Sequence, residues 1–198
     1  MFLRRLFAPR SPSAQAPRAL YDAAVEQARR PAFYSELGVP DTLDGRFELI
    51  CLHVYLILRR LRADHAGTGR LAQDLFDTMF ADMDGSLREL GAGDLGVGPR
   101  VKKMARNFYG RVAAYDAGID GSDAELEDAL RRNLYGTVAA PEPASVTAMA
   151  GYTRREAAAL ADASLQSIAA GEVHFGAPPP AEASQPAADS GARAKVQD

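Results

Sequence analysis

The chain has 198 residues, 47% hydrophobic and 25% charged, which is the profile of one globular domain. Its formal net charge of -3 excludes a global positive field that would recruit DNA or RNA, so any anionic partner must be recognised by a local patch. The single cysteine, Cys51, excludes an internal disulfide, and its apolar neighbours predict a buried, inert thiol.

The N-terminal residues 1–7 are basic and apolar, but no apolar stretch of signal-peptide length follows them. They suit a mitochondrial transit peptide, a weak contact with a membrane surface, or a frayed terminus. Three prolines within residues 8–17 are typical of a linker. We therefore expect a flexible basic segment over residues 1–17.

The periodicity of apolar residues predicts an all-α fold, with one compact domain of about six helices over residues 18–175. Helices are expected over 18–29, 42–64, 69–90, 99–117, 123–134 and 154–170, with a short helical turn at 31–37. The helix at 42–64 carries apolar residues on several faces, so the other helices should surround it. Its apolar run at 49–58 is ten residues, about half of the roughly 20 that a membrane-spanning helix needs.

Several local signals mark where these helices begin. Asp41 is a plausible cap for the helix at 42–64. Glycines at 91–98 form a connector, and Pro99 then suits the first position of a helix. Two capping boxes open the last two helices, Ser122 with Glu125 and Thr153 with Glu156. Residues 176–198 contain almost nothing to bury, which predicts a disordered tail.

Residue patterns that carry metal, phosphate or nucleophile chemistry are not found in this sequence. The three histidines show no paired spacing, and His53 is expected to be a satisfied helix residue. Residues 82–85 lack the later ligands of a calcium loop, and the glycines at 91–98 lack the strand that precedes a phosphate loop. We expect no metal, no cofactor and no catalytic residue.

Charged residues divide between two neighbouring helices. Acids gather at 74–94, and Arg88 among them is expected to bond acids or carbonyls around the glycine connector. The next helix carries five bases with no acid between them: Arg100, Lys102, Lys103, Arg106 and Arg111. Such a run is either a solvated face or a site for ribosomal RNA, anionic lipid or an acidic protein.

The stretch from Phe76 to Asp94 resembles the signature of the ubiquinol–cytochrome c chaperone family, as do residues 97–104 and 108–115. The resemblance covers about residues 30–135. The motif residues are Asp82, Asp84, Leu87, Arg88, Glu89, Gly91, Gly93, Asp94, Phe108, Tyr109, Gly110 and Arg111.

This resemblance implies an all-helical, non-catalytic assembly chaperone for the quinol–cytochrome c reductase, with newly made cytochrome b as its client. It implies a place at the inner membrane, on the matrix side in a mitochondrion or the cytoplasmic side in a bacterium. A helical adaptor that binds the ribosome or RNA through the basic helix is the alternative, and a small helical enzyme is a third.

A chaperone of this kind needs an apolar groove for exposed helices of its client. Methionines suit such an adaptable surface, and Met79, Met83 and Met104 lie near the glycine connector. These three methionines and the five bases of the following helix are the candidate partner-binding residues.

Overall fold

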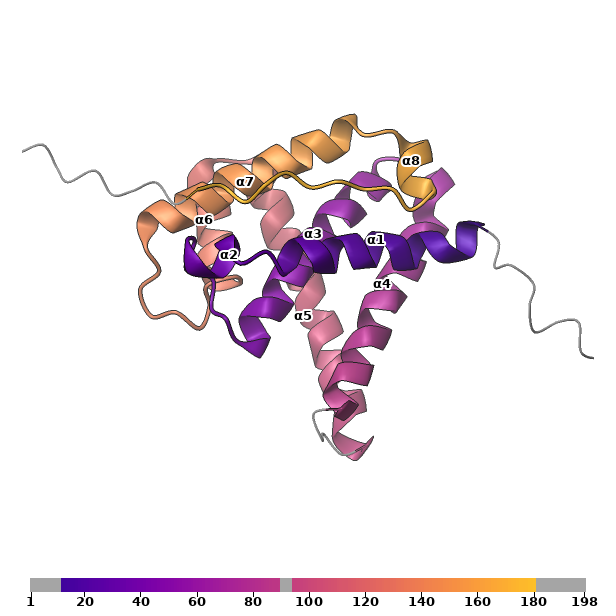
Figure 1. The fold of residues 1–198 in the computed structure, drawn as a ribbon, viewed down its shortest axis with the longest axis horizontal. Coiled ribbons are helices and arrows are strands. Elements are labelled where there is room, and N and C mark those ends of the chain that lie inside the picture. The colour runs from indigo at the N-terminus through magenta and orange to yellow at the C-terminus, as the bar shows by residue number, and fades with distance from the viewer. Residues whose placement is uncertain (1–11, 90–93, 181–198) are drawn as a thin grey trace, which may run out of the picture.

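A computed structural model describes residues 12–89 and 94–180, and at 12–14, 65, 87 and 94–103 it describes the backbone alone. Within these ranges the fold is all-α, as predicted (Figure 1). The helices are α1 (Pro12–Ala28), α2 (Ala32–Ser35), α3 (Leu43–Arg62), α4 (His65–Glu89), α5 (Asp94–Asp120), α6 (Asp123–Arg132), α7 (Pro143–Asp162) and α8 (Leu165–Ala169).

Helix α3 lies at the centre of the fold. Residues 51–57 are all buried, and α1, α4 and α7 pack against the helix. The expectation of a surrounded helix is therefore confirmed, and so is the burial of Cys51, which is 1% exposed. Helices α4 and α5 form a long hairpin that projects beyond this packed body (Figure 1).

The predicted capping box of α6 is confirmed. The Ser122 hydroxyl accepts from the Glu125 amide at 3.3 Å, and the Glu125 carboxylate accepts from the Ser122 amide at 2.7 Å. Helix α3 is capped one residue later than expected, because the Thr42 hydroxyl accepts from the Gly45 amide at 3.2 Å. Asp41 instead forms an ion pair with Arg46 on the surface.

Helix α1 begins at Pro12, whereas the proline pattern predicted a linker up to residue 17. That prediction is wrong for residues 12–17: the fixed φ angle of Pro12 suits the first turn of a helix, and Pro17 lies inside the helix. Ala16 and Pro17 are buried, and the backbone of Ala16 lies against Gly171. Packing against the far end of the chain therefore extends the helix toward its N-terminus.

The second predicted capping box is wrong, because Thr153 and Glu156 lie inside α7, which begins at Pro143. The buried Thr153 hydroxyl donates to the Met149 carbonyl at 2.7 Å, and Glu156 accepts from the Gly176 amide at 2.8 Å. Both side chains match the box pattern but make other bonds in the folded protein. The last expected helix is thus divided into α7 and the short α8.

Two further helix starts lie upstream of their predicted positions. Helix α4 begins at His65, and buried Thr68 secures its first turn by donating to the carbonyls of Leu61 and Asp64. The glycines at 67 and 69 are therefore helical. Helix α5 begins at Asp94, so Pro99 lies within the helix and not at its first position.

The sequence predicted that a disordered tail starts at residue 176, and this predicted start is too early in the chain. The Gly176 carbonyl accepts from the Gln27 amide group at 2.7 Å, and Arg155 donates to the Ala177 carbonyl at 2.8 Å. These bonds join the segment after α8 to α1 and α7, and Figure 1 shows it running along α7. The folded part therefore extends past residue 175.

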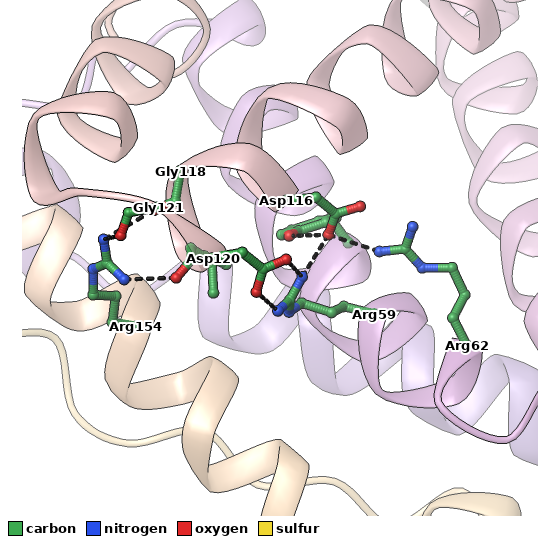
Figure 2. Close-up of polar contacts among 9 residues, drawn as sticks. Arg59, Arg62, Asp116, Gly118, Asp120, Gly121 and Arg154 are labelled. Carbon is green, nitrogen blue, oxygen red and sulfur yellow. Dashed lines mark hydrogen bonds and ion pairs between the residues drawn. The ribbon is translucent and has the colours of Figure 1, made fainter.

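Ion pairs tie the C-terminal half of α3 to α5 (Figure 2). Arg59 bonds Asp116 at 2.7 Å and Asp120 at 2.5 Å, and Arg62 bonds Asp116 at 2.8 Å. Arg154 of α7 donates to the carbonyl groups of the last turn of α5, including Gly118 at 2.9 Å. The C-terminal end of α5 is thus held from two sides, while its N-terminal half belongs to the projecting hairpin.

Candidate functional site: a groove beside the α4–α5 hairpin

A groove of about 460 Å³ lies where the α4–α5 hairpin meets the start of α3 and the segment after α6. Its lining residues come from four parts of the chain that are far apart in sequence. They are Leu43, Asp44, Gly45, Phe47, Glu48, Met83, Ser86, Met104, Asn107, Arg111, Arg132, Asn133, Leu134, Gly136 and Thr137.

The walls of the groove are largely apolar. Phe47 from α3, Met83 from α4 and Met104 from α5 are each partly exposed, and Phe47 and Met104 also pack against the core. Leu43 is 61% exposed and lies in the first turn of α3, just after the Thr42 cap. Unbranched methionines can adapt to differently shaped partners, so the groove suits apolar side chains of another protein.

An ion pair lies among these apolar residues. The Nε of Arg111 donates to Glu48 Oε2 at 2.6 Å, and its Nη2 donates to Oε1. The side chains of Arg111 and Glu48 are only 14% and 11% exposed, and the guanidinium lies 5.8 Å from the centre of the Phe47 ring. Burial raises the pKa of Glu48 above its ordinary value, and the bond from Arg111 opposes that rise.

The candidate partner-binding residues separate into three groups. Met83, Met104 and Arg111 line the groove, whereas Met79 is fully buried in the core and offers no surface. Arg106 is exposed but does not line the groove. The side chains of Arg100, Lys102 and Lys103 lie outside the part that the structure describes.

Arg111 differs from the solvated base that its place in the basic run suggested. Its acid partner, Glu48, comes from α3, 63 residues earlier in the chain. The run of bases without intervening acids therefore gave no sign of this partner. This pair lies in the groove and not on the outer face of α5.

The family-motif residues on α4 join that helix to its surroundings. Asp82 accepts from the Tyr21 hydroxyl of α1 at 2.8 Å. Asp84 accepts from Arg88 at 2.7 Å, so the expected bond from Arg88 to an acid is present, but that side chain is 49% exposed. Glu89 is exposed, and the Leu87 side chain is not among those described.

The motif residues on α5 have contrasting environments. Phe108 is buried at 1% exposure beside Phe76 and Phe80 of α4, while Tyr109 is 62% exposed and its ring contacts that of Phe76. A Cβ atom added to Gly110 would meet nothing within 4 Å. Gly91, Gly93 and the side chain of Asp94 lie outside the described part.

Sequence reasoning missed most of the groove, including Leu43, Phe47, Glu48 and Leu134. Glu48 did carry a signal, because it is an acid beside the apolar run of α3. A carboxylate that the apolar run buries needs a partner, so the position of Glu48 could have suggested that it pairs, without saying with which residue. The identity of the partner depends on how α3 and α5 pack.

A comparison with known families now identifies the group to which this chain belongs. The model of the ubiquinol-cytochrome C chaperone family matches residues 35–175. The chain belongs to this family. The match includes all the groove-lining residues and extends beyond the span of about 30–135 that the motifs suggested.

Relatives of this chaperone-family chain include assembly factors of the ubiquinol-cytochrome-c reductase complex. It is 25% identical over 137 residues to ubiquinol-cytochrome-c reductase complex assembly factor 1 of Xenopus laevis, covering 69% of this chain and 68% of that protein. It is 32% identical over 108 residues to mitochondrial protein CBP3 of Saccharomyces cerevisiae, covering 52% of this chain but only 32% of the yeast protein.

A solved structure has the same fold. The crystal structure of the Cbp3 homolog from Brucella abortus is 38% identical to this chain and superposes with a TM-score of 0.75. The match covers 84% of this chain and 91% of that one. None of the helices in the described part of this chain has the length and apolar character needed to cross a bilayer.

Proposed function

We propose that this chain is a non-catalytic chaperone for assembly of the ubiquinol–cytochrome c reductase, and that its groove holds an apolar helix of newly made cytochrome b. Its relatives are named as assembly factors of this complex. An unassembled membrane subunit exposes apolar helices, and covering them requires a binding surface rather than catalysis.

The observation that carries this proposal is the groove itself. Phe47, Met83 and Met104 line it from three helices, and their side chains remain partly open to solvent. A partner helix presents side chains at three- and four-residue steps, which can insert between such residues. Exposed Leu43 at the mouth would extend the contact beyond the groove.

Leu43 and Tyr109 provide a matched test of the binding surface. Leu43 is 61% exposed and lines the groove, whereas Tyr109 is 62% exposed and does not line it. Two variants of the full chain are made, each with a photoreactive amino acid at one of these positions. Each variant is expressed in the native organism in place of the unaltered protein. After irradiation during synthesis of the reductase, cross-linked partners are identified by mass spectrometry.

The proposal expects an adduct with cytochrome b from position 43 and not from position 109. An adduct with cytochrome b from position 109 alone would place the client on the outer face of α5. Adducts with ribosomal components from position 109, and none with cytochrome b from either position, would favour the adaptor that binds the ribosome or RNA.

A further inference from the structure

We infer that the groove selects an apolar helix that carries one hydrogen-bonding side chain, and that the Glu48–Arg111 pair recognises this side chain. The inference rests on the proposed function, because it specifies the kind of client segment that the same groove accepts. It predicts a preference between helices of equal length and similar hydrophobicity.

The geometry of the pair leaves one end of the guanidinium available. Arg111 uses Nε and Nη2 to bond the two carboxylate oxygens of Glu48. None of the described residues accepts a hydrogen bond from its Nη1 group, although both residues of the pair line the groove. Asn107, which is exposed and also lines the groove, adds an amide that can donate and accept.

Because the Glu48–Arg111 pair has little contact with solvent, a bound helix that covers it can leave its polar atoms without hydrogen-bond partners. Arg111 and Glu48 are 14% and 11% exposed, so their remaining polar atoms reach solvent only over a small area. A wholly apolar helix would displace that water and leave the Nη1 donor without an acceptor. A side chain such as asparagine would replace the water with a direct bond, and one such bond to a charged group changes affinity by roughly tenfold.

The fold alone does not account for an ionic pair at this place. Replacement of a buried ion pair by apolar residues of similar volume is often neutral or stabilising. Phe47, Met83, Met104 and Leu134 would provide apolar neighbours for such a replacement. A nearly buried charged pair on a largely apolar binding surface is better explained by recognition of a polar group.

The inference is tested with two fluorescent peptides of about 20 residues, each a leucine–alanine helix flanked by lysines. One has leucine at its centre and the other asparagine. Fluorescence anisotropy in detergent micelles measures their affinity for the full chain. We expect the asparagine peptide to bind roughly tenfold more tightly.

Variants of the full chain attribute this preference to the pair. The double variant Glu48→Met with Arg111→Met should bind both peptides almost equally. Arg62→Met removes an arginine whose ion pair with Asp116 lies outside the groove, and it should keep the tenfold ratio. Circular dichroism establishes that each variant is folded.

Equal affinities for the unaltered chain, or tighter binding of the leucine peptide, would overturn the inference. If the double variant does not fold, the guanidinium NMR signals of Arg111 in the unaltered chain decide the question. They should shift with the asparagine peptide and not with the leucine peptide, and equal shifts would overturn the inference. A cytochrome b adduct from position 43 together with equal peptide affinities would refute this inference alone and leave the proposed function standing.

Discussion

His53 is the centre of a buried hydrogen-bond network that joins three helices. Its Nδ1 lies 2.7 Å from the Leu49 carbonyl, which can only accept, so Nδ1 carries the proton. Its Nε2 then accepts from the Tyr152 hydroxyl at 2.8 Å, and that hydroxyl accepts from Gln27 at 2.8 Å. The expectation of a satisfied helix histidine is confirmed. Neutral His53 therefore links α3 to α7 and, through Gln27, to α1.

A fall in pH should lower the stability of the folded protein, because protonation of His53 is unfavourable in the core. Burial lowers the pKa of His53 from 6.5 to about 4, so the unfolded chain takes up the proton first as the pH falls. The stability from neutral His53 is present above pH 6.5 and is lost as the pH falls toward 4. We expect a loss of about 2 kcal/mol between pH 7 and pH 5, measured by urea denaturation.

The variant His53→Gln is the control for this pH dependence. Glutamine can still donate to the Leu49 carbonyl and accept from Tyr152, but it does not titrate. The variant should be less stable at pH 7 and should lose less stability between pH 7 and pH 5. Parallel curves for the two proteins would show that His53 does not cause the acid sensitivity.

At the scale of elements, two glycines of α5 show how closely that helix approaches its neighbours. A Cβ added to Gly118 would lie 2.6 Å from the Leu126 Cα of α6, whereas one added to Gly110 would meet nothing within 4 Å. Close packing therefore requires a glycine at position 118. No contact within the described chain explains the glycine at position 110.

These positions give opposite predictions for the same substitution. Gly118→Ala should destabilise the fold by about 1–3 kcal/mol, because the backbones of α5 and α6 must separate. Gly110→Ala should stabilise it by up to about 1 kcal/mol, because alanine favours the interior of a helix. Thermal denaturation of both variants measures this, and a destabilised Gly110→Ala variant would contradict the prediction.

The segment after α8 yields a prediction about truncation. Removal of residues 181–198 should leave the thermal midpoint nearly unchanged, because their composition offers little to bury. Removal of residues 176–198 should cost about 1–3 kcal/mol, because buried Glu156 loses the Gly176 amide and Gln27 loses the Gly176 carbonyl. Equal midpoints for the two truncated chains would show that these bonds contribute nothing.

At the scale of the whole molecule, local signals predicted the helices better than they predicted the site. The Ser122 box was correct because its two partners lie three residues apart in the chain. The matching Thr153 and Glu156 pattern failed because tertiary packing assigned both side chains to other partners. Only packing brings Glu48 to Arg111, so no local pattern could have joined them.

The molecule presents two separate surfaces on α5, and a charge reversal can distinguish them. Arg106 is exposed away from the groove, and the sequence pattern also places Lys102 and Lys103 off the apolar stripe. Reversal of exposed charges usually changes stability by less than about 0.5 kcal/mol, but it lowers the rate of association with an anionic partner. We therefore expect Lys102→Glu, Lys103→Glu and Arg106→Glu together to leave the chain folded and to reduce its recruitment at low salt.

This prediction is measured by circular dichroism and by co-sedimentation with ribosomes and with anionic vesicles at two salt concentrations. A control variant reverses Arg29 and Arg30, which are exposed at the end of α1, and should bind as the parent does. Unchanged binding of the triple variant in both assays would show that the basic run is only a solvated face. Loss of ribosome binding with normal accumulation of cytochrome b would instead assign a ribosome contact to this face, separate from the groove. The groove would then hold the client independently of Arg106, which does not line it, although Met104 and Arg111 of the same helix do.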